Sequence, residues 1–216
     1  MGVNRTYAVL GLGRYGLSVA RELVANGADV LAVDFDEKIV NAVATELPFC
    51  KCADVGNLEV LKQLGIGEID VVVVSMANNL EASVMTVMLC KELGVKTVIA
   101  KCANEMHQRL LKKVGADKVV VPEYESGIRR AKNMISSGMI DIIELSKEVS
   151  IVEMEVKPEW VGKSLIELNL RGAYSINVIA IRRGDELSAD IDPRMQLDAE
   201  MSLVVVINTK MLRKMK

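Results

Sequence analysis

The sequence is poor in aromatic residues, which account for 3% of its 216 residues, and it contains a single histidine. It has no run approaching the roughly 20 apolar residues that a membrane-spanning helix requires, so we expect no membrane span. The formal net charge is only −2, which argues against a nucleic-acid-binding surface. Residues 1–6 lead directly into an apolar stretch and leave no room for a secretory signal. These features predict a well-cored cytoplasmic protein.

The sequence also lacks any recognisable catalytic set. It has no serine–histidine–aspartate arrangement, no metal cluster and no Gly-x-x-x-x-Gly-Lys-Ser/Thr loop, and its only histidine, His107, falls in a predicted helix. The cysteines form no Cys-x-x-Cys pair, so we expect small buried thiols rather than a zinc site. They are Cys50, Cys52, Cys90 and Cys102. This pattern favours a protein that binds a ligand over one that transforms it.

What the sequence does contain is a complete dinucleotide-binding strand–helix–strand unit over residues 7–34. An apolar strand ends at Gly11, which makes the tight turn, Gly13 allows a pyrophosphate to approach, and Gly16 lets the next helix lie close to the strand. That helix directs its N-terminal N–H groups at the phosphate. A second strand ends in Asp34, whose carboxylate can accept hydrogen bonds from a ribose diol. The alternative is a glycine-rich turn in an ordinary α/β protein.

Strands and helices continue to alternate beyond this unit. The run Val71–Val74 is typical of a strand buried on both faces of a parallel sheet, and Asn78 or Asn79 can cap a long helix through Leu93. Six strands separated by helices predict an α/β fold with an open, Rossmann-like, doubly wound parallel sheet. The expected strands cover 7–10, 30–34, 49–53, 71–74, 97–99 and 118–121, and later helices follow Asp36 and cover 58–64, 79–93 and 105–114.

A further helix is expected after Pro122, from Glu123 to about Ser137. One face of it is apolar at helical spacing, and this stripe either packs on a second copy of the chain or folds back on its own sheet. The residues of the stripe are Ile128, Ala131, Ile135 and Met139.

The composition changes from Ser150 onward. Alternating stretches at 151–156, 177–181 and 202–207 predict strands, and Ser164–Leu168 predicts a short helix between them. We therefore expect a second, small C-terminal α+β domain, with a division of the chain into 1–140 and 141–216. A domain of this size is near the limit of independent stability, so we expect it to dimerise.

Open α/β sheets bind ligands outside the carboxyl ends of their strands. Arg14 stands inside the glycine loop and would hold phosphates, or else point into solvent. Asp54 could meet an adenine amino group, and Lys101 a phosphate or a ribose hydroxyl. Glu123 suggests a bound Mg²⁺, Ca²⁺ or Na⁺, or it is an ordinary acid in a helix first turn. The candidate contacts are Gly11, Gly13, Arg14, Tyr15, Gly16, Asp34, Asp54, Val55, Ser75, Met76, Ala77, Lys101 and Glu123.

Segments along nearly the whole chain carry a family resemblance. They are Ala8–Gly16, Val33–Asp34, Ala53–Asp54, Leu64–Ile66, Leu80–Ser83, Lys91–Leu93, Val114–Asp117, Pro122–Glu123 and Ile176–Gly184. With these segments the sequence resembles the RCK family, the cytoplasmic domains that regulate potassium conductance, and within it the KtrA/TrkA-type regulatory subunits of potassium uptake.

The resemblance implies a Rossmann N-lobe, a crossover helix that dimerises and a C-lobe, with four dimers in an octameric ring beneath a separate membrane potassium-translocating subunit. It further implies that ATP favours the open state and ADP the closed state, with NAD(H) as an alternative occupant, and that Arg14 holds the terminal phosphate at the dimer interface. Such a protein would be cytoplasmic and peripheral at the inner face of the membrane. The competing functions are an NAD-dependent oxidoreductase and a free-standing redox or nucleotide sensor.

The same resemblance suggests a second ligand, because the C-lobe of several Ktr-type subunits is a receptor for cyclic di-AMP. The matching residues are Arg171, Ile176, Asn177, Ile179 and Pro193. Arg171 could meet a phosphate, and Ile179 and Pro193 could sandwich a base, although the same residues are equally compatible with a purely structural role. The sequence departs from the family at Ala173–Ser175, where a glycine is usual.

Overall fold

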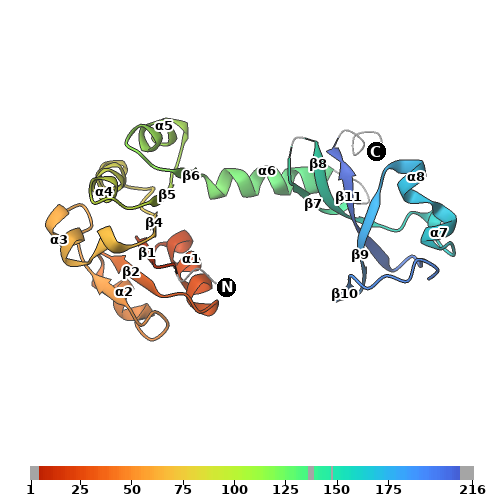
Figure 1. Ribbon diagram of the computed structural model, residues 1–216, viewed down its shortest axis with the longest axis horizontal. Helices are drawn as coiled ribbons and strands as arrows, with labels where there is room; N and C mark the ends of the chain where they lie inside the picture. The colour runs from red at the N-terminus through yellow and green to blue at the C-terminus, as the bar shows by residue number, and fades with distance from the viewer. Residues whose placement is uncertain (1–4, 136–138, 147, 210–216) are drawn as a thin grey trace. The chain divides into compact units, whose positions relative to one another are not determined.

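The computed structural model describes residues 5–135, 139–146 and 148–209 (Figure 1). The chain divides into two compact units, Met1–Glu123 and Tyr124–Lys216. This division falls within the helix that begins at Pro122, whereas we expected a boundary after residue 140. The boundary at 140, which assigns that helix to the nucleotide domain, remains a proposal.

The first unit is built on a six-stranded parallel sheet in the order β3-β2-β1-β4-β5-β6. This order, with helices between successive strands, confirms the predicted doubly wound Rossmann-like fold (Figure 1). Each expected strand is present with small differences at its ends. The strands are β1 (Tyr7–Leu10), β2 (Val30–Asp34), β3 (Cys50–Cys52), β4 (Val71–Val74), β5 (Thr97–Lys101) and β6 (Lys118–Val120).

Both faces of this sheet are covered. Val72 and Val74 of β4 belong to one hydrophobic core and Val73 to the other, and all four residues of the strand are buried. The long helix after β4 begins with Asn79 as its N-cap, as expected, because the side chain accepts the N–H of Ala82 at 3.0 Å. The helices are α1 (Arg14–Ala25), α2 (Glu37–Val43), α3 (Leu58–Gln63), α4 (Leu80–Glu92) and α5 (Glu105–Lys113).

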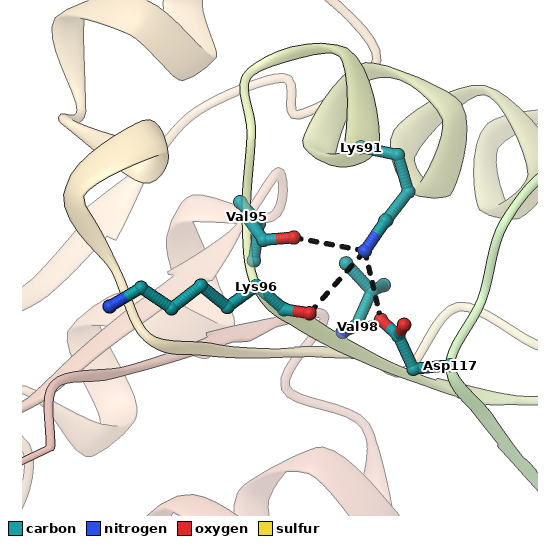
Figure 2. A network of polar contacts seen from close by, with 5 residues as sticks. All are labelled: Lys91, Val95, Lys96, Val98 and Asp117. Carbon is teal, nitrogen blue, oxygen red and sulfur yellow. Dashed lines mark hydrogen bonds and ion pairs between the residues drawn. The ribbon is translucent and has the colours of Figure 1, made fainter.

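The amino ends of β5 and β6 are fastened to α4 by the half-buried Lys91 (Figure 2). Nζ of Lys91 donates to the carbonyl oxygen of Val95 at 3.0 Å and to Oδ2 of Asp117 at 3.0 Å. The same carboxylate oxygen accepts the N–H of Val98 at 2.7 Å. This network stabilises the sheet at the amino ends of its strands. The predicted site residues lie at the opposite edge, at the carboxyl ends of the strands.

His107 is buried between α4 and α5, with 2% of its surface exposed. The N–H of Ala103 donates to Nδ1 at 3.5 Å, so Nε2 carries the proton and donates to the hydroxyl of Ser83 at 3.2 Å. Burial lowers the pKa of the imidazole. The histidine is therefore a neutral core residue that joins two helices.

The prediction of buried thiols is correct for Cys90 and Cys102 and wrong for the other two. Burial raises the pKa of Cys90 to about 12. Cys50 is only partly buried and Cys52 is exposed, because β3 is the edge strand of the sheet and has a neighbour on one side only.

The second unit contains a five-stranded antiparallel sheet in the order β10-β9-β11-β8-β7. The three predicted strands and the predicted short helix are present, and Ser164 caps that helix in a capping box with Glu167. The elements are β7 (Met139–Glu144), β8 (Val149–Glu155), α7 (Leu165–Leu168), α8 (Leu170–Tyr174), β9 (Asn177–Arg183), β10 (Glu186–Ser188) and β11 (Met201–Asn208).

Sequence reasoning missed β7, β10 and α8. The first has an irregular register between Met139 and Asp141, which breaks the alternating pattern. All three residues of β10 are exposed, so the strand has no apolar face to reveal it. The short helix α8 has five residues and lies between Asn169 and Ser175, which both have left-handed backbones.

The helix α6 (Pro122–Ile135) exposes the two residues of its predicted apolar stripe whose side chains the structure describes. Ile128 is 39% exposed and Ala131 is exposed, while the side chain of Ile135 lies outside the described residues. The assignment of Met139 to this helix is wrong, because the helix ends at Ile135 and Met139 is the first residue of β7. Whether a second copy covers this stripe remains a proposal. Among the described residues, no helix is long and apolar enough to cross a membrane.

Candidate nucleotide-binding site

A cavity of about 1080 Å³ lies at the carboxyl ends of the strands of the first unit. Every candidate residue from the sequence except Gly16 lines it, which brings together segments up to 112 residues apart, from Gly11 to Glu123. Several lining residues had not been predicted: Val33, Phe35, Ile39, Cys52, Gly56, Asn78, Asn79 and Ala82.

The glycine loop has the geometry that the spacing predicts. Gly11 has a φ of +94°, which side chains rarely adopt, and a Cβ at Gly16 would collide with the carbonyl oxygen of Gly11. Gly16 thus belongs to the packing between helix and strand and is not a wall of the cavity. At Gly13 a Cβ would meet nothing within 4 Å, so the backbone there faces open space.

The N-terminus of α1 presents its backbone to this cavity. Gly13 is the N-cap and provides no side-chain hydrogen bond, and no acidic residue stands in the first turn. Arg14, the first residue of the helix, is exposed and lines the cavity. The positive end of the helix dipole and a guanidinium group therefore lie side by side, an arrangement suited to phosphate.

Asp34 is buried, with 7% of its surface exposed, at the end of β2. Its Oδ2 accepts the N–H of Leu12 at 2.7 Å, and its Oδ1 accepts the N–H of Asp36 at 3.0 Å. Each carboxylate oxygen has a second lone pair, so the side chain can hold the glycine loop and still accept a hydrogen bond from a ribose hydroxyl. The ribose contact itself remains a prediction.

Lys101 and Glu123 form an ion pair on the other side of the cavity. Nζ of Lys101 lies 2.7 Å from Oε1 of Glu123 and 5.9 Å from the centroid of the Tyr15 ring. The hydrogen bond from Lys101 holds the pKa of Glu123 below its usual range, with a smaller electrostatic contribution from Arg14. Neither the pairing nor the position of Tyr15 beside it was evident from the sequence.

The region next to Asp34 is more apolar. Phe35 is 80% exposed, and its carbonyl oxygen accepts a hydrogen bond from Sγ of Cys52 at 3.4 Å. In the loop after the neighbouring strand β3, Oδ1 of Asp54 accepts the N–H of Gly56 at 2.9 Å and so shapes that loop. An aromatic residue directly after Asp34, in a chain with so few aromatics, is the sequence signal that could have identified Phe35.

The remaining predicted contacts lie on two loops that the core holds in place. Val55 is buried, and its carbonyl oxygen accepts the hydroxyl of Thr86 at 3.2 Å. Ser75 donates its N–H to the carbonyl oxygen of Leu10 at 2.7 Å, which continues the pairing of β1 with β4 into the cavity. Met76 and Ala77 follow and are half-buried.

No group of three or more histidine, cysteine, aspartate or glutamate side chains that could hold a metal ion occurs within the part of the chain that the structure describes. Glu123, the residue expected to bind a cation, has the ammonium group of Lys101 as its partner.

A smaller cavity of about 470 Å³ occurs in the second unit. Arg171, Ile176 and Asn177 line it, whereas Ile179 and Pro193, also predicted to hold a second ligand, do not. Ile179 is exposed at 42%. Pro193 belongs to the neighbouring loop, where its carbonyl oxygen accepts the N–H of Ile166 at 3.2 Å.

These features define a Rossmann-type nucleotide-binding fold joined to a small α+β domain. The TrkA-N domain family matches residues 7–122 and the TrkA-C domain family matches residues 149–216, so the chain belongs to the family of proteins that combine the two.

Known proteins resemble the chain over most of its length. It is 39% identical to Ktr system potassium uptake protein C of Bacillus subtilis, over 86% of this chain and 84% of that protein. It is 33% identical to Ktr system potassium uptake protein A of the same organism, over 98% of this chain and 95% of that protein. Among solved structures, the GsuK channel bound to NAD has a TM-score of 0.69 at 16% identity, covering 96% of this chain and 38% of that one.

Proposed function

We propose that this protein is a regulatory subunit of a potassium uptake system. The proposal is supported by its relatives, the Ktr system potassium uptake proteins, which it matches nearly from end to end. Its partner would be a membrane potassium-translocating subunit, and the protein would act in the cytoplasm at the inner face of the membrane.

We further propose that the cavity binds an adenine nucleotide, with ATP and ADP as the ligands and NAD(H) as an alternative occupant. The observation that carries this proposal is that the α1 N-terminus, Arg14, Lys101 and Asp34 all line one cavity. A ligand shifts a gate only by binding one state more tightly. In the family arrangement ATP favours the open state and ADP the closed one, and we propose the same here.

A regulatory role fits the site better than hydride transfer does. A dehydrogenase needs an acid or base beside the substrate carbonyl, and the histidine of this chain is buried away from the cavity. The competing oxidoreductase would have to use another acid or base of the cavity lining, such as Lys101 or Tyr15. Turnover of NADH with small carbonyl compounds would favour it.

Assembly is the third element of the proposal. We propose a dimer through the α6 stripe (Ile128, Ala131 and Ile135), and an octamer of four dimers in the presence of nucleotide. In such a ring Arg14 would reach the terminal phosphate at the dimer interface. A cation could join Glu123 and the phosphates, provided that Glu123 leaves Lys101.

The smaller cavity supports a second candidate function, the binding of cyclic di-AMP by the C-terminal domain. Arg171 and Asn177 both line this cavity. Arg171 could bind a phosphate, and Asn177 could form hydrogen bonds with a phosphate or with the edge of an adenine. The ring centroid of Trp160 lies 6.1 Å from that of Tyr174 in α8, so the fluorescence of Trp160 would report on such binding. A full-length protein whose Trp160 emission and calorimetric baseline are unchanged by cyclic di-AMP would contradict this second candidate.

The main proposal is tested by calorimetric titration of the full-length protein with ATP, ADP and NADH. Binding of at least one at tens of micromolar is expected, and mass spectrometry of the ligand that co-purifies would identify the physiological occupant. If none of the three binds, the nucleotide proposal is wrong.

A further inference from the structure

One ion pair connects the nucleotide cavity to the first turn of α6. Lys101 is the last residue of β5 and Glu123 the second residue of α6, and their charged atoms lie 2.7 Å apart. Glu123 is also the last residue of the first compact unit, and Tyr124 begins the second. The contact therefore lies where the chain passes from one unit to the other.

The two partners differ in their surroundings. The side chain of Lys101 is 18% exposed and that of Glu123 is 70% exposed, so the lysine is held in the cavity wall while the carboxylate is accessible. The ammonium group also lies over the ring of Tyr15, 5.9 Å from its centroid, within range of a cation–π attraction. Glu123 also feels the charge of Arg14, so it occupies the positive region that the N-terminus of α1 extends.

We propose that Glu123 is a positioning residue that competes with the phosphates of a nucleotide for Lys101, so that ligand entry releases the first turn of α6. This inference rests on the proposed nucleotide binding. A phosphate group carries more negative charge than a carboxylate and offers three acceptor oxygens, so the exchange is favourable for the lysine. Because the pair stands at the junction between the units, occupancy of the cavity changes how firmly α6 is held.

If Glu123 is instead a ligand of a bridging cation, removal of its charge has the opposite effect on nucleotide binding. A competitor for Lys101 weakens nucleotide binding, whereas a ligand of a bridging cation strengthens it. The two roles are separated by comparing Glu123→Gln in EDTA and in Mg²⁺. In EDTA only the competition for Lys101 remains, so the substitution tightens ATP binding, whereas in Mg²⁺ the loss of a cation ligand would weaken it.

The first measurement is the affinity for ATP in EDTA. We expect Glu123→Gln to bind ATP about threefold more tightly than the wild type, since one negative charge near the phosphates is removed in a solvated site, and Lys101→Met to bind it more weakly. Glu46→Gln is the matched control, because that carboxylate pairs with Arg21 at 2.6 Å in the same unit but does not line the cavity. Equal or weaker ATP binding by Glu123→Gln would overturn the proposal.

The second measurement is hydrogen exchange of backbone amides in the full-length protein. ATP in EDTA should speed exchange in the first turns of α6 while it protects residues 11–16. Glu123→Gln should show the faster exchange in α6 without ATP, with no further increase when ATP is added. Protection of residues 11–16 without a change in α6 overturns this inference alone. If the wild type binds none of ATP, ADP and NADH, the proposed nucleotide binding is overturned as well.

Discussion

The carboxylate of Asp34 accepts the backbone N–H of Leu12 at 2.7 Å, although 22 residues separate the two in the chain. Both residues are buried, with 7% and 2% of their surfaces exposed. The bond ties the end of β2 to the glycine loop after β1. The residue that the sequence identifies as a ribose ligand therefore also fixes the loop that would receive the pyrophosphate.

Replacing Asp34 should thus affect both stability and binding. Asp34→Ala leaves the buried N–H of Leu12 without its acceptor, which costs about 1–3 kcal/mol of unfolding free energy, and it should weaken nucleotide binding by a similar amount. Chemical denaturation and calorimetry measure the two effects. Asp34→Asn is the matched control, because it keeps one oxygen for Leu12 while it loses the charge. Undiminished affinity in Asp34→Ala would show that the ribose is held elsewhere.

The environment of Asp34 also predicts the choice between two cofactors. A carboxylate with Phe35, and no basic residue, directly after it should accept a 2′-hydroxyl and repel a 2′-phosphate, so NADPH should bind more weakly than NADH. Phe35→Arg places a guanidinium group at the exposed edge of the cavity and should reduce the difference in affinity between NADH and NADPH. Competition titrations with both cofactors measure it. Equal affinities in the wild type would contradict this reading.

The layout of the first unit could be predicted from the sequence because its signals are local. The valine run of β4 and the capping Asn79 each report the structure of their own segment. The pairs that shape the site are not local. Lys101 and Glu123 were each assigned to a ligand, and nothing in their separate positions shows that they bind each other. Such pairs follow from how strands and helices meet in three dimensions.

The buried histidine predicts a dependence of stability on pH. Burial lowers the pKa of His107 below the value of about 6.5 that it has in an unfolded chain. The unfolded chain therefore takes up a proton first as the pH falls, so the contribution of His107 to stability is full above pH 6.5 and declines below it. Denaturation of the wild type and of His107→Gln between pH 5 and 7.5 should show a steeper loss for the wild type. Parallel curves would mean that the histidine does not titrate differently on folding.

Ser175 shows how a departure from the family pattern is accommodated. The resemblance leads to the expectation of a glycine in the segment Ala173–Ser175, and in the structure Ser175 has a φ of +55°, in the left-handed region. Ser175→Gly should therefore stabilise the protein by up to about 1 kcal/mol, because relief of the strain exceeds the added freedom of the unfolded chain.

The residue at the other end of α8, Asn169, provides the control for this substitution. Asn169 also has a left-handed backbone, with a φ of +41°, but its Oδ1 accepts the N–H of Gly172 at 3.3 Å. Asn169→Gly removes that cap and should not stabilise the protein. Thermal denaturation of both variants tests the pair. A Ser175→Gly variant no more stable than the wild type would indicate that the turn carries little strain.

The exposed stripe on α6 predicts how the protein associates. Ile128 is 39% exposed, and a β-branched apolar side chain on an open helix face is stabilised when a second copy covers it. Light scattering at micromolar concentration should give about twice the chain mass of 23.6 kDa, and larger assemblies once nucleotide is added. Ile128→Asp should shift the protein toward the monomer, because it places a charge within the apolar contact. Ser126→Asp, an acid at another exposed position of the same helix, should leave the dimer intact. A wild-type mass of 23.6 kDa would contradict association through α6.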